Sequence, residues 1–436
     1  MSYDLGDLVT VGQSKALAQR VKAELAAAQS GGSIDFPAND DKLYAVKNGA
    51  WTAISESSVI APVPGSAPAG SDVLAWVKST TTLTGGSATN YYFVGSSQFC
   101  HTHITYKGVT YALISYQNGS GTSVSYNLFF YQKTGTRYKS IATIATKSTL
   151  GTRLDSTNHA ICIVDNIMYV TVSTNLYTLN LDCLIDSTIA KQFEEVTDYT
   201  AINVSGNSAG YMTRCYGMCY SPTLDLILMV GNGVASGATS SSLCLRTMTG
   251  TPDTGLTFGD VTDISQQLPG WSSFYLNNIY WSEVLGKFIG SSQYGTAVSS
   301  DGLNWEYQTD TKPLFYMLDC PEHHCLYAFK NGSNVPYMSN DGLVWIALTA
   351  YGIPPNTSSP SALVYAPELG LFCAIPNGSQ DYVLISNDMK HWAKTTMPDT
   401  ASRGYLYWSS AENAFKCASS VGSGASQIVS FYDLTF

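Results

Sequence analysis

The stretch Ser299-Ser300-Asp301-Gly302-Leu303-Asn304-Trp305 decides the fold, because the chain repeats it twice more towards its C-terminus. Residues 339–345 are a near copy, and residues 386–392 are a degraded one. The aspartates at positions 301, 341 and 388 are therefore 40 and 47 residues apart. A period of this length is typical of one β-propeller blade per copy, so the stretch predicts an architecture rather than an activity.

The residue types in this stretch suit a tight turn. Asp can accept hydrogen bonds from backbone N–H groups two residues further on, and Gly adopts positive φ angles that other residues resist. A Trp three residues after the Gly can fold back over the turn and bury a large apolar area. We therefore assign a structural role, and no catalytic one, to the residues at these positions, which are Asp301, Gly302, Trp305, Asp341, Gly342, Trp345, Asp388 and Trp392.

Short apolar strands alternate with turns from about residue 90 to the end of the chain. They group into seven units, at residues 103–131, 159–179, 216–245, 278–305, 315–345, 362–392 and 405–431. Each unit with its loop takes up about 50 residues, which suits a blade of about four strands. The sequence therefore predicts an all-β protein with a seven-bladed β-propeller over residues 90–436.

The last unit shows only three strands, whereas residues 90–94 form a spare strand before the first unit. Open sheet edges invite unwanted pairing, and proteins usually cover them. We therefore expect residues 90–94 to pair with residues 426–434, which would complete the last blade and close the ring.

The low charge of the chain disfavours several classes of function. Charged residues make up 12% of the sequence, and the net charge is −10. Binding to nucleic acid requires clustered Lys and Arg, and the sequence has no such cluster. The start of the chain lacks the basic and apolar regions of a signal peptide, and no apolar run reaches about 18 residues. We therefore expect neither secretion nor insertion into a membrane.

Cysteine and histidine patterns give weak signals for metal binding. Most of the ten cysteines lie in apolar, strand-like runs, and without a secretion signal we expect reduced core thiols. Ligand types come close together at residues 320–325, with two Cys and two His, and at the pair His101 and His103. The first group falls on a predicted hairpin turn whose sister blades lack these residues. We predict no metal site and no cofactor.

Three segments precede the predicted propeller. Residues 11–29 are predicted to form a helix, because helix-forming residues follow a capping box and two glycines end the run. Residues 43–54 predict a β-hairpin around an Asn-Gly dipeptide, which favours tight turns. Residues 61–89 are rich in Pro, Gly, Ser and Thr and predict a linker.

The predicted helix and hairpin both need a partner, because a short helix is marginal alone in water and a lone hairpin is unstable. The partner can be the same segment in other subunits, a docking surface, or the globular part of the chain itself. The residues expected to contribute to oligomerisation or attachment are the apolar stripe of the helix and the hairpin Trp, namely Leu17, Val21, Leu25, Ala28 and Trp51.

The N-terminal region, residues 1–60, also resembles known proteins. A capped helix over residues 7–25 is followed by the segment 40–51, which contains the Asn-Gly dipeptide. This combination resembles the N-terminal attachment region of fibre and adhesin proteins of tailed bacteriophages. The resemblance implies a protein of the virion surface that is anchored to capsid or tail proteins through residues 1–60. The lack of a signal peptide predicts synthesis in the host cytoplasm, and the need of the hairpin for a partner is met most simply by two more copies, which predicts a homotrimer.

The repeated stretch is similar to the Asp box of sialidases and many other propellers, although it lacks one residue of that pattern and the usual Thr. In that family the box is structural and lies away from the ligand face. Sialidases also use three arginines on a carboxylate, whereas the six arginines here lie at positions that do not match between blades. The carboxylates that recur near the first turn of the last four units favour exposed turn residues over a catalytic acid pair, and they are Glu283, Glu322, Glu368 and Glu412.

The sequence thus predicts a phage fibre or adhesin that binds a host surface receptor through propeller loops. A glycan is the expected ligand, since Tyr and Trp rings stack on sugars. The ligand-binding residues and the head or tail placement stay open. Two alternatives remain: a glycan-cleaving hydrolase, favoured by a pocket with two converging carboxylates, and a structural capsid or tail decoration fibre, favoured by short loops without a groove. We predict no catalytic residue.

Overall fold

The computed structural model divides the chain into two compact units, Met1–Ala61 and Pro62–Phe436. No helix in the described part of the chain is long and apolar enough to cross a membrane. The residues that the structure describes are 43–47, 50–54, 76–82, 90–93, 103–118, 125–134, 137–145, 159–172, 175–201, 210–268, 278–292, 295–309, 314–330, 332–354, 357, 360–376, 379–402, 405–421 and 428–435.

The described part of the first unit is a β-hairpin. Strands β1 (Leu43–Lys47) and β2 (Ala50–Ile54) pair antiparallel with a two-residue connection at the Asn-Gly dipeptide, and Trp51 lies opposite Val46. The helix predicted over residues 11–29 lies outside the described residues, together with its apolar stripe of Leu17, Val21, Leu25 and Ala28.

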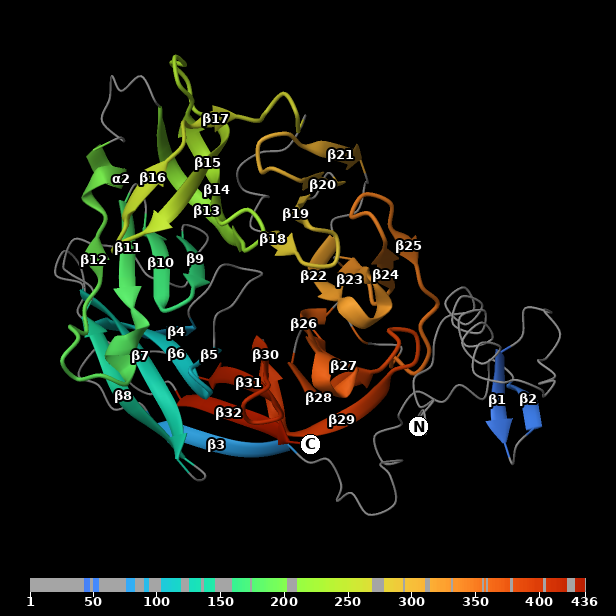
Figure 1. Ribbon diagram of the computed structural model, residues 1–436. Helices are drawn as coiled ribbons and strands as arrows, with labels where there is room; N and C mark the ends of the chain where they lie inside the picture. Colours follow the sequence, from blue (N-terminus) through green and yellow to red (C-terminus); the bar gives the residue numbers. More distant parts are fainter. Residues whose placement is uncertain are drawn as a thin grey trace, which may run out of the picture. The chain divides into compact units, whose positions relative to one another are not determined.

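The second unit is a ring of seven antiparallel sheets, which confirms the predicted all-β, seven-bladed propeller (Figure 1). We number the blades 1 to 7 along the chain. In each blade the strands follow one another outward from the centre of the ring, except that two short strands share the inner edge of blade 1 and two share the outer edge of blade 3 (Figure 1). The first strands of neighbouring blades pack against each other, as those of blades 2 and 3 do.

The strands of blades 1 to 3 are, in chain order, β4 (Asn90–Phe93), β5 (His103–Tyr106), β6 (Val109–Asn118), β7 (Ser125–Thr134) and β8 (Arg137–Ala145) in blade 1, β9 (His159–Val164), β10 (Ile167–Val172), β11 (Asn175–Asn180) and β12 (Glu194–Glu195) in blade 2, and β13 (Tyr211–Ser221), β14 (Leu226–Val234), β15 (Ser242–Thr251), β16 (Gly255–Phe258) and β17 (Thr262–Asp263) in blade 3. A short helix, α2 (Thr197–Ala201), lies between blades 2 and 3 in the sequence, and a 3-10 turn, η3 (Leu181–Leu184), follows β11.

The strands of blades 4 to 7 are β18 (Asn278–Ser282), β19 (Lys287–Ser292), β20 (Gly295–Ser299) and β21 (Glu306–Thr309) in blade 4, β22 (Leu314–Cys320), β23 (Cys325–Lys330), β24 (Pro336–Ser339) and β25 (Ile346–Ala347) in blade 5, β26 (Pro360–Ala366), β27 (Leu371–Pro376), β28 (Ser379–Ser386) and β29 (Ala393–Ser402) in blade 6, and β30 (Tyr405–Ser409), β31 (Ala414–Val421), β32 (Ile428–Thr435) and β3 (Trp76–Thr82) in blade 7. Short 3-10 turns, η5 (Pro321–His323) and η6 (Pro367–Leu369), join the first two strands of blades 5 and 6.

The strand that completes blade 7 comes from an unexpected part of the chain. β3 pairs along its whole length with β32, from Trp76 opposite Leu434 to Thr82 opposite Ile428. The prediction that residues 90–94 would close the ring is therefore wrong, because β4 pairs with β6 in blade 1 instead. β3 also lies within the stretch that was predicted to be a linker, residues 61–89.

The lengths of the blade 1 strands explain this difference. β6 has ten residues, and β5 covers only the edge at Val109–Ala112. The remaining edge of β6 takes up β4, which is therefore no spare strand. The Thr-rich run in β3 lies in the predicted linker, yet Thr is well suited to an edge strand because of its β-branched side chain.

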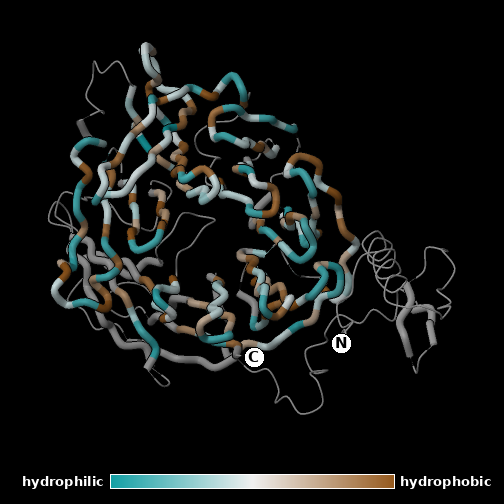
Figure 2. Tube along the Cα trace, viewed as in Figure 1, coloured by the Kyte–Doolittle hydropathy of each residue, from teal (hydrophilic) through white to brown (hydrophobic). Residues whose placement is uncertain are grey.

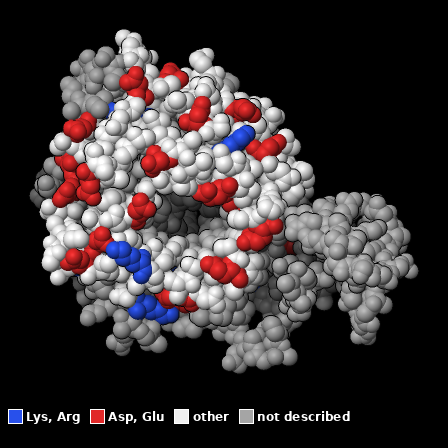
Figure 3. Space-filling model, in the orientation of Figure 1, with Lys and Arg blue, Asp and Glu red and all other residues white. Residues whose placement is uncertain are grey.

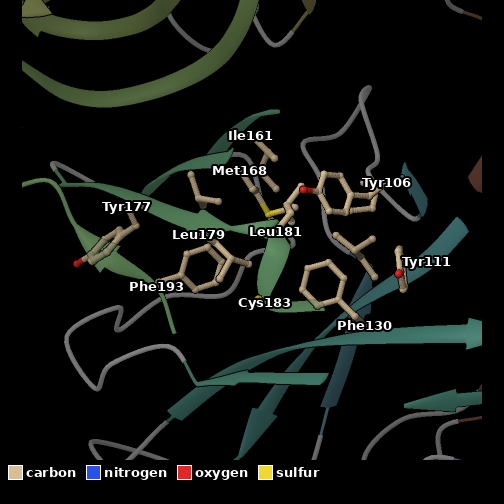
Figure 4. Close-up of a cluster of buried hydrophobic side chains, with 13 residues drawn as sticks. Tyr106, Tyr111, Phe130, Ile161, Met168, Tyr177, Leu179, Leu181, Cys183 and Phe193 are labelled. Atoms are coloured by element: carbon tan, nitrogen blue, oxygen red, sulfur yellow. The ribbon is translucent and has the colours of Figure 1, made fainter. Parts of the chain in front are cut away.

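Apolar side chains fill the spaces between consecutive blades. Hydrophobic residues lie along the strands, and hydrophilic residues lie at many of the turns (Figure 2). Between blades 1 and 2, Phe130 and Tyr106 pack on one side of a buried cluster, with Ile161, Met168 and Leu179 on the other (Figure 4). Similar clusters lie between each following pair of blades up to blades 6 and 7. Each blade is therefore held by its neighbours.

An engineered disulfide between β3 and β32 tests which strand closes the ring. Thr80 lies opposite Ser430, and Thr81 lies opposite Val429. Adjacent pairs in an antiparallel ladder alternate between close and wide spacing, so one of these two pairs suits a disulfide. We expect T80C/S430C or T81C/V429C to oxidise almost completely and to raise the free energy of unfolding by about 2–4 kcal/mol. Mass spectrometry and denaturant unfolding measure both effects.

The matched control is the double variant Y92C/V429C, which places the first cysteine on β4. We expect no cross-link in this variant, because β4 pairs with β6. A cross-link in the control, together with none in either β3 variant, would contradict the closure by β3.

Candidate functional site

The three repeated stretches form turns between the third and fourth strands of blades 4, 5 and 6, and we call them the aspartate turns (residues 299–305, 339–345 and 386–392). In the first turn, Asp301 Oδ1 accepts hydrogen bonds from the N–H groups of Leu303 and Asn304, both at 2.8 Å. The other two turns repeat these bonds at 2.7–2.8 Å. The aspartate oxygens therefore stabilise the turn itself.

The tryptophan of each aspartate turn folds back and packs towards the preceding blade. Trp305 Nε1 donates to the carbonyl of Gly302 at 3.1 Å, and Trp345 and Trp392 make the equivalent bond at 3.2 and 2.9 Å. The Trp305 ring joins the apolar cluster between blades 3 and 4, and the Trp392 ring joins that between blades 5 and 6. Trp345 also donates to Thr296 of blade 4 at 3.3 Å. Each aspartate turn thus connects two blades.

The residue after the aspartate lies close to the preceding blade. Gly302 and Gly342 have φ angles of +78° and +79°, and a Cβ added to Gly342 would lie 2.7 Å from Val298 Cγ1 of blade 4. In the third turn Met389 takes this place with φ +62°, and its side chain is fully buried in the cluster between blades 5 and 6. Glycine is required where the neighbouring blade comes close, and methionine fills the wider space.

The aspartates of these turns are charged at neutral pH. Burial opposes the ionisation of Asp301, but the N–H groups of Asn304 and Leu303 outweigh it and lower the pKa to about 2. The pKa values of Asp341 and Asp388 are also lowered, again because hydrogen bonds outweigh burial. A carboxylate with a low pKa whose oxygens are already used is a poor proton donor and a poor substrate ligand.

The recurring glutamates form hydrogen bonds and ion pairs with neighbouring side chains. In the first turn of blade 6, Glu368 accepts a hydrogen bond from Trp408 Nε1 of blade 7 at 2.7 Å. Glu322 of blade 5 accepts a hydrogen bond from Cys320 Sγ at 3.8 Å. Glu412 forms an ion pair with Lys416 at 2.7 Å. These carboxylates lie in the turns of different blades and are occupied by structural contacts, so they do not form a catalytic pair.

A polar seam joins blade 1 to blade 7. Thr110 Oγ1 and Ser409 Oγ form a buried hydrogen bond at 2.5 Å. Thr105 Oγ1 bonds to the hydroxyl of Tyr407 at 2.8 Å. These pairs link residues about 300 positions apart in the chain, and a hydrogen bond of this kind stabilises a contact by about 1 kcal/mol.

Buried charges continue this seam. Asp433 of blade 7 pairs with Lys133 of blade 1 and, at 3.1 Å, with Lys416 of its own blade. Burial opposes the ionisation of Asp433, but the charges of Lys416 and Lys133 outweigh it and lower its pKa. Lys416 and Asp433 were not singled out from the sequence. In the sequence these two residues are recognisable only as charged residues within strands that are otherwise mostly apolar.

His103 belongs to the same seam. Its ring stacks on Tyr407 at 5.7 Å between centroids and is almost fully buried. Burial, together with the charge of Lys416, lowers its pKa to about 3, so the ring is neutral at neutral pH. The other half of the candidate metal pair, His101, lies outside the described residues.

The group at residues 320–325 forms a hairpin turn. Cys320 lies opposite Cys325 at the start of the turn, and both are buried free thiols, like the other described cysteines. Burial raises their pKa values to about 12 and 11, which disfavours the thiolate that a metal or a substrate would need. His323 Nδ1 bonds to the Tyr327 hydroxyl at 2.8 Å. Within the described ranges, no group of three or more His, Cys, Asp or Glu residues could hold a metal ion.

The antiparallel blades give the ring two different faces. The turn face carries the connections between first and second strands and between third and fourth strands, including the aspartate turns. The loop face carries the connections between second and third strands and the links between blades. Several of these, such as residues 119–124 and 269–277, lie outside the described residues.

The turn face is acidic. Asp and Glu side chains are spread around the central hollow of the face seen in Figure 3, and few Lys or Arg side chains appear there. An acidic surface disfavours nucleic acid and other polyanions. The carboxylates that the topology places in these turns are Asp165, Asp182, Asp186, Asp225, Asp253, Glu283, Asp301, Glu322, Asp341, Glu368, Asp388 and Glu412.

Comparisons with known proteins assign the chain to no family. No protein-family model and no curated protein matches the sequence. Similar solved structures include the extracellular domain of a hybrid two-component system from B. thetaiotaomicron (11% identity, TM-score 0.45, 79% of this chain and 40% of that one). Others are virginiamycin B lyase from Staphylococcus aureus (9%, 0.46, 82% and 99%) and a sialidase mutant from Trypanosoma rangeli with trans-sialidase activity (9%, 0.37, 82% and 59%). The chain spans less than half the length of the first of these.

Alanine substitution of turn glycines tests the contact between blades. Gly286 has φ +60° with open space around its Cβ position, so G286A measures the cost of the backbone conformation alone. Gly342 has a similar φ but lies against Val298. We expect G342A to lower the free energy of unfolding by at least about 1 kcal/mol more than G286A, as denaturant unfolding can measure. Equal losses of unfolding free energy in G342A and G286A would show that the aspartate turn of blade 5 is not in close contact with blade 4.

The buried His103 predicts a pH dependence of stability. The folded-state pKa lies near 3, whereas the unfolded chain protonates at about 6.5, so the unfolded state binds more protons below that pH. The contribution of His103 is complete above pH 6.5 and is lost as the pH falls towards 3. Between pH 8 and pH 5 the protein therefore loses about 2 kcal/mol of unfolding free energy through this histidine.

The variant H103Q should therefore show a flatter stability profile between pH 8 and pH 5 than the parent chain. The control is Y407F, which removes a hydrogen bond from the same seam but leaves His103 in place. We expect Y407F to be less stable at every pH with an unchanged slope. A parental slope in H103Q would contradict the buried, neutral histidine.

Proposed function

We propose that the chain is a fibre or adhesin of a tailed bacteriophage, anchored by residues 1–60, that binds a host surface glycan with its propeller. The observation that carries this proposal is the division into two compact units, a small N-terminal one with a β-hairpin and a large closed ring. The N-terminal unit is the part whose sequence resembles phage attachment regions. A separate anchor and a rigid outer domain suit attachment to a cell.

The loop face is the proposed receptor-binding face. On the turn face, Asp301, Asp341, Asp388, Glu368 and Glu412 already stabilise turns or blade contacts. Binding residues usually lie on loops that a rigid scaffold positions. The link between blades 3 and 4 carries Trp271, Phe274 and Tyr275 within nine residues, and aromatic rings of this kind stack on sugars.

Binding without cleavage fits the described side chains best. Glycosidases need two carboxylates about 5–10 Å apart on either side of the sugar bond. The recurring glutamates are in separate blades, and three of them already have partners in their own or the next blade. We accordingly propose a receptor-binding protein, carried on the virion surface as a homotrimer through residues 1–60, rather than a hydrolase.

Binding of the purified full-length chain to bacterial cells and to a glycan array tests this proposal. We expect saturable binding to at least one strain, with competition by its isolated surface polysaccharide. The variants W271A and Y275A should each weaken this binding at least about fivefold, since one aromatic contact contributes about 1 kcal/mol.

The control variant is Y351A. Tyr351 is an exposed aromatic residue in the link between blades 5 and 6. Unlike the rest of that link, it pairs with the third aspartate turn, where its ring stacks on His391, so it lies on the turn face. It should leave the binding unchanged. Absence of binding to a broad panel of strains and glycans, or equal losses in Y351A and the loop variants, would refute receptor binding by the loop face.

A further inference from the structure

Arg246 is a buried cation with no acidic hydrogen-bond partner among the described residues. It lies on β15 of blade 3, and its side chain is 1% exposed. Its Nε donates to the carbonyl of Gly259 at 3.1 Å, but its Nη1 has no hydrogen-bond partner within the described part of the chain. A buried guanidinium with one unpaired nitrogen is costly, by several kcal/mol for an unpaired charge, and such groups are normally satisfied.

Aromatic rings cover this guanidinium. Its Cζ lies 4.8 Å from the ring centre of Phe258 and 5.2 Å from that of Tyr199. Tyr199 belongs to the short helix α2 and is completely buried, and its hydroxyl also lacks a partner among the described residues. Cation–π contacts compensate part of the charge but supply no hydrogen-bond acceptor. Arg246 Nη1 and the Tyr199 hydroxyl are thus two neighbouring buried donors that both need a hydrogen-bond acceptor.

The fold brings this site near the surface. The outer edge of blade 3 is interrupted opposite Arg246, because β16 ends at Phe258 and β17 begins at Thr262. The exposed Asp260 lies in this interruption and acts on Arg246 only through its electrostatic field.

We propose that Arg246 and Tyr199 form a binding site for a small oxyanion, a carboxylate or a phosphate. An oxygen of such an ion would accept hydrogen bonds from Nη1 of Arg246 and from the Tyr199 hydroxyl, and its charge would pair with the guanidinium. A water molecule would satisfy the donors but would leave the buried charge unpaired. The site is independent of the receptor binding proposed above.

The small number of arginines makes this site directly observable. The chain has six, so protein labelled with ¹⁵N-arginine gives six Nε–H signals in an NMR spectrum. Sodium phosphate and sodium acetate are titrated separately at constant ionic strength, with sodium chloride as the balancing salt. We expect the Arg246 signal, assigned by its loss in R246K, to shift saturably with one of the two anions and a Kd near the millimolar range.

Two variants distinguish binding at this site from nonspecific binding of anions to the surface. Y199F removes only the hydroxyl and keeps the ring, and it should weaken the anion binding at least fivefold. R214K changes an exposed arginine of the same blade and should leave it unchanged. The thermal midpoint of the parent chain should rise with the bound anion, and that of Y199F should rise less.

The proposal fails under any of three results. The first is a linear, unsaturated response of the Arg246 signal to both anions. The second is an unchanged affinity in Y199F. The third is a large shift of the Arg246 signal in D260N without added anion, because Asp260 would then be the partner of the guanidinium in solution.

Discussion

The structure depends on backbone pairing between strands from opposite ends of the propeller. β3 supplies the outer strand of blade 7, whose other three strands are the last of the chain. Without it the ring would be joined across blades 7 and 1 by side chains alone, through the hydrogen bonds and ion pairs of the seam. Seven blades in a closed ring can then hold one another through the clusters between them. Closure therefore turns seven weak sheets into one rigid body.

This rigidity bears on function. The repeated aspartates and the recurring glutamates of the turn face are the obvious candidates for catalytic groups. In the structure, Asp301, Asp341 and Glu368 stabilise turns and blade contacts instead. The acidic turn face also disfavours polyanionic partners. A scaffold of this kind leaves recognition to the loop face and attachment to the N-terminal unit, which is the arrangement that we propose for a virion adhesin.

Local chemistry could be predicted from the sequence, and long-range pairing could not. Asp301, Gly302 and Trp305 act within seven residues, so their spacing was enough to predict the turns and the blade repeat, and the alternation of short apolar strands with turns gave the number of blades. The closing strand was missed because residues 76–82 and 90–94 are both short β-forming runs. Only the unequal lengths of β5 and β6, which appear in the structure, decide between them. Arg246 and Lys416 were missed because burial of a charge depends on neighbours far away in the chain.

The central claim is that β3 is an integral strand of the last blade, and amide hydrogen exchange tests it most directly. The account predicts that the amides of residues 76–82 that pair with β32 exchange as slowly as those of β32, and that both are released only by global unfolding. Exchange of residues 76–82 at the rate of an unstructured chain, while β32 stays protected, would contradict it.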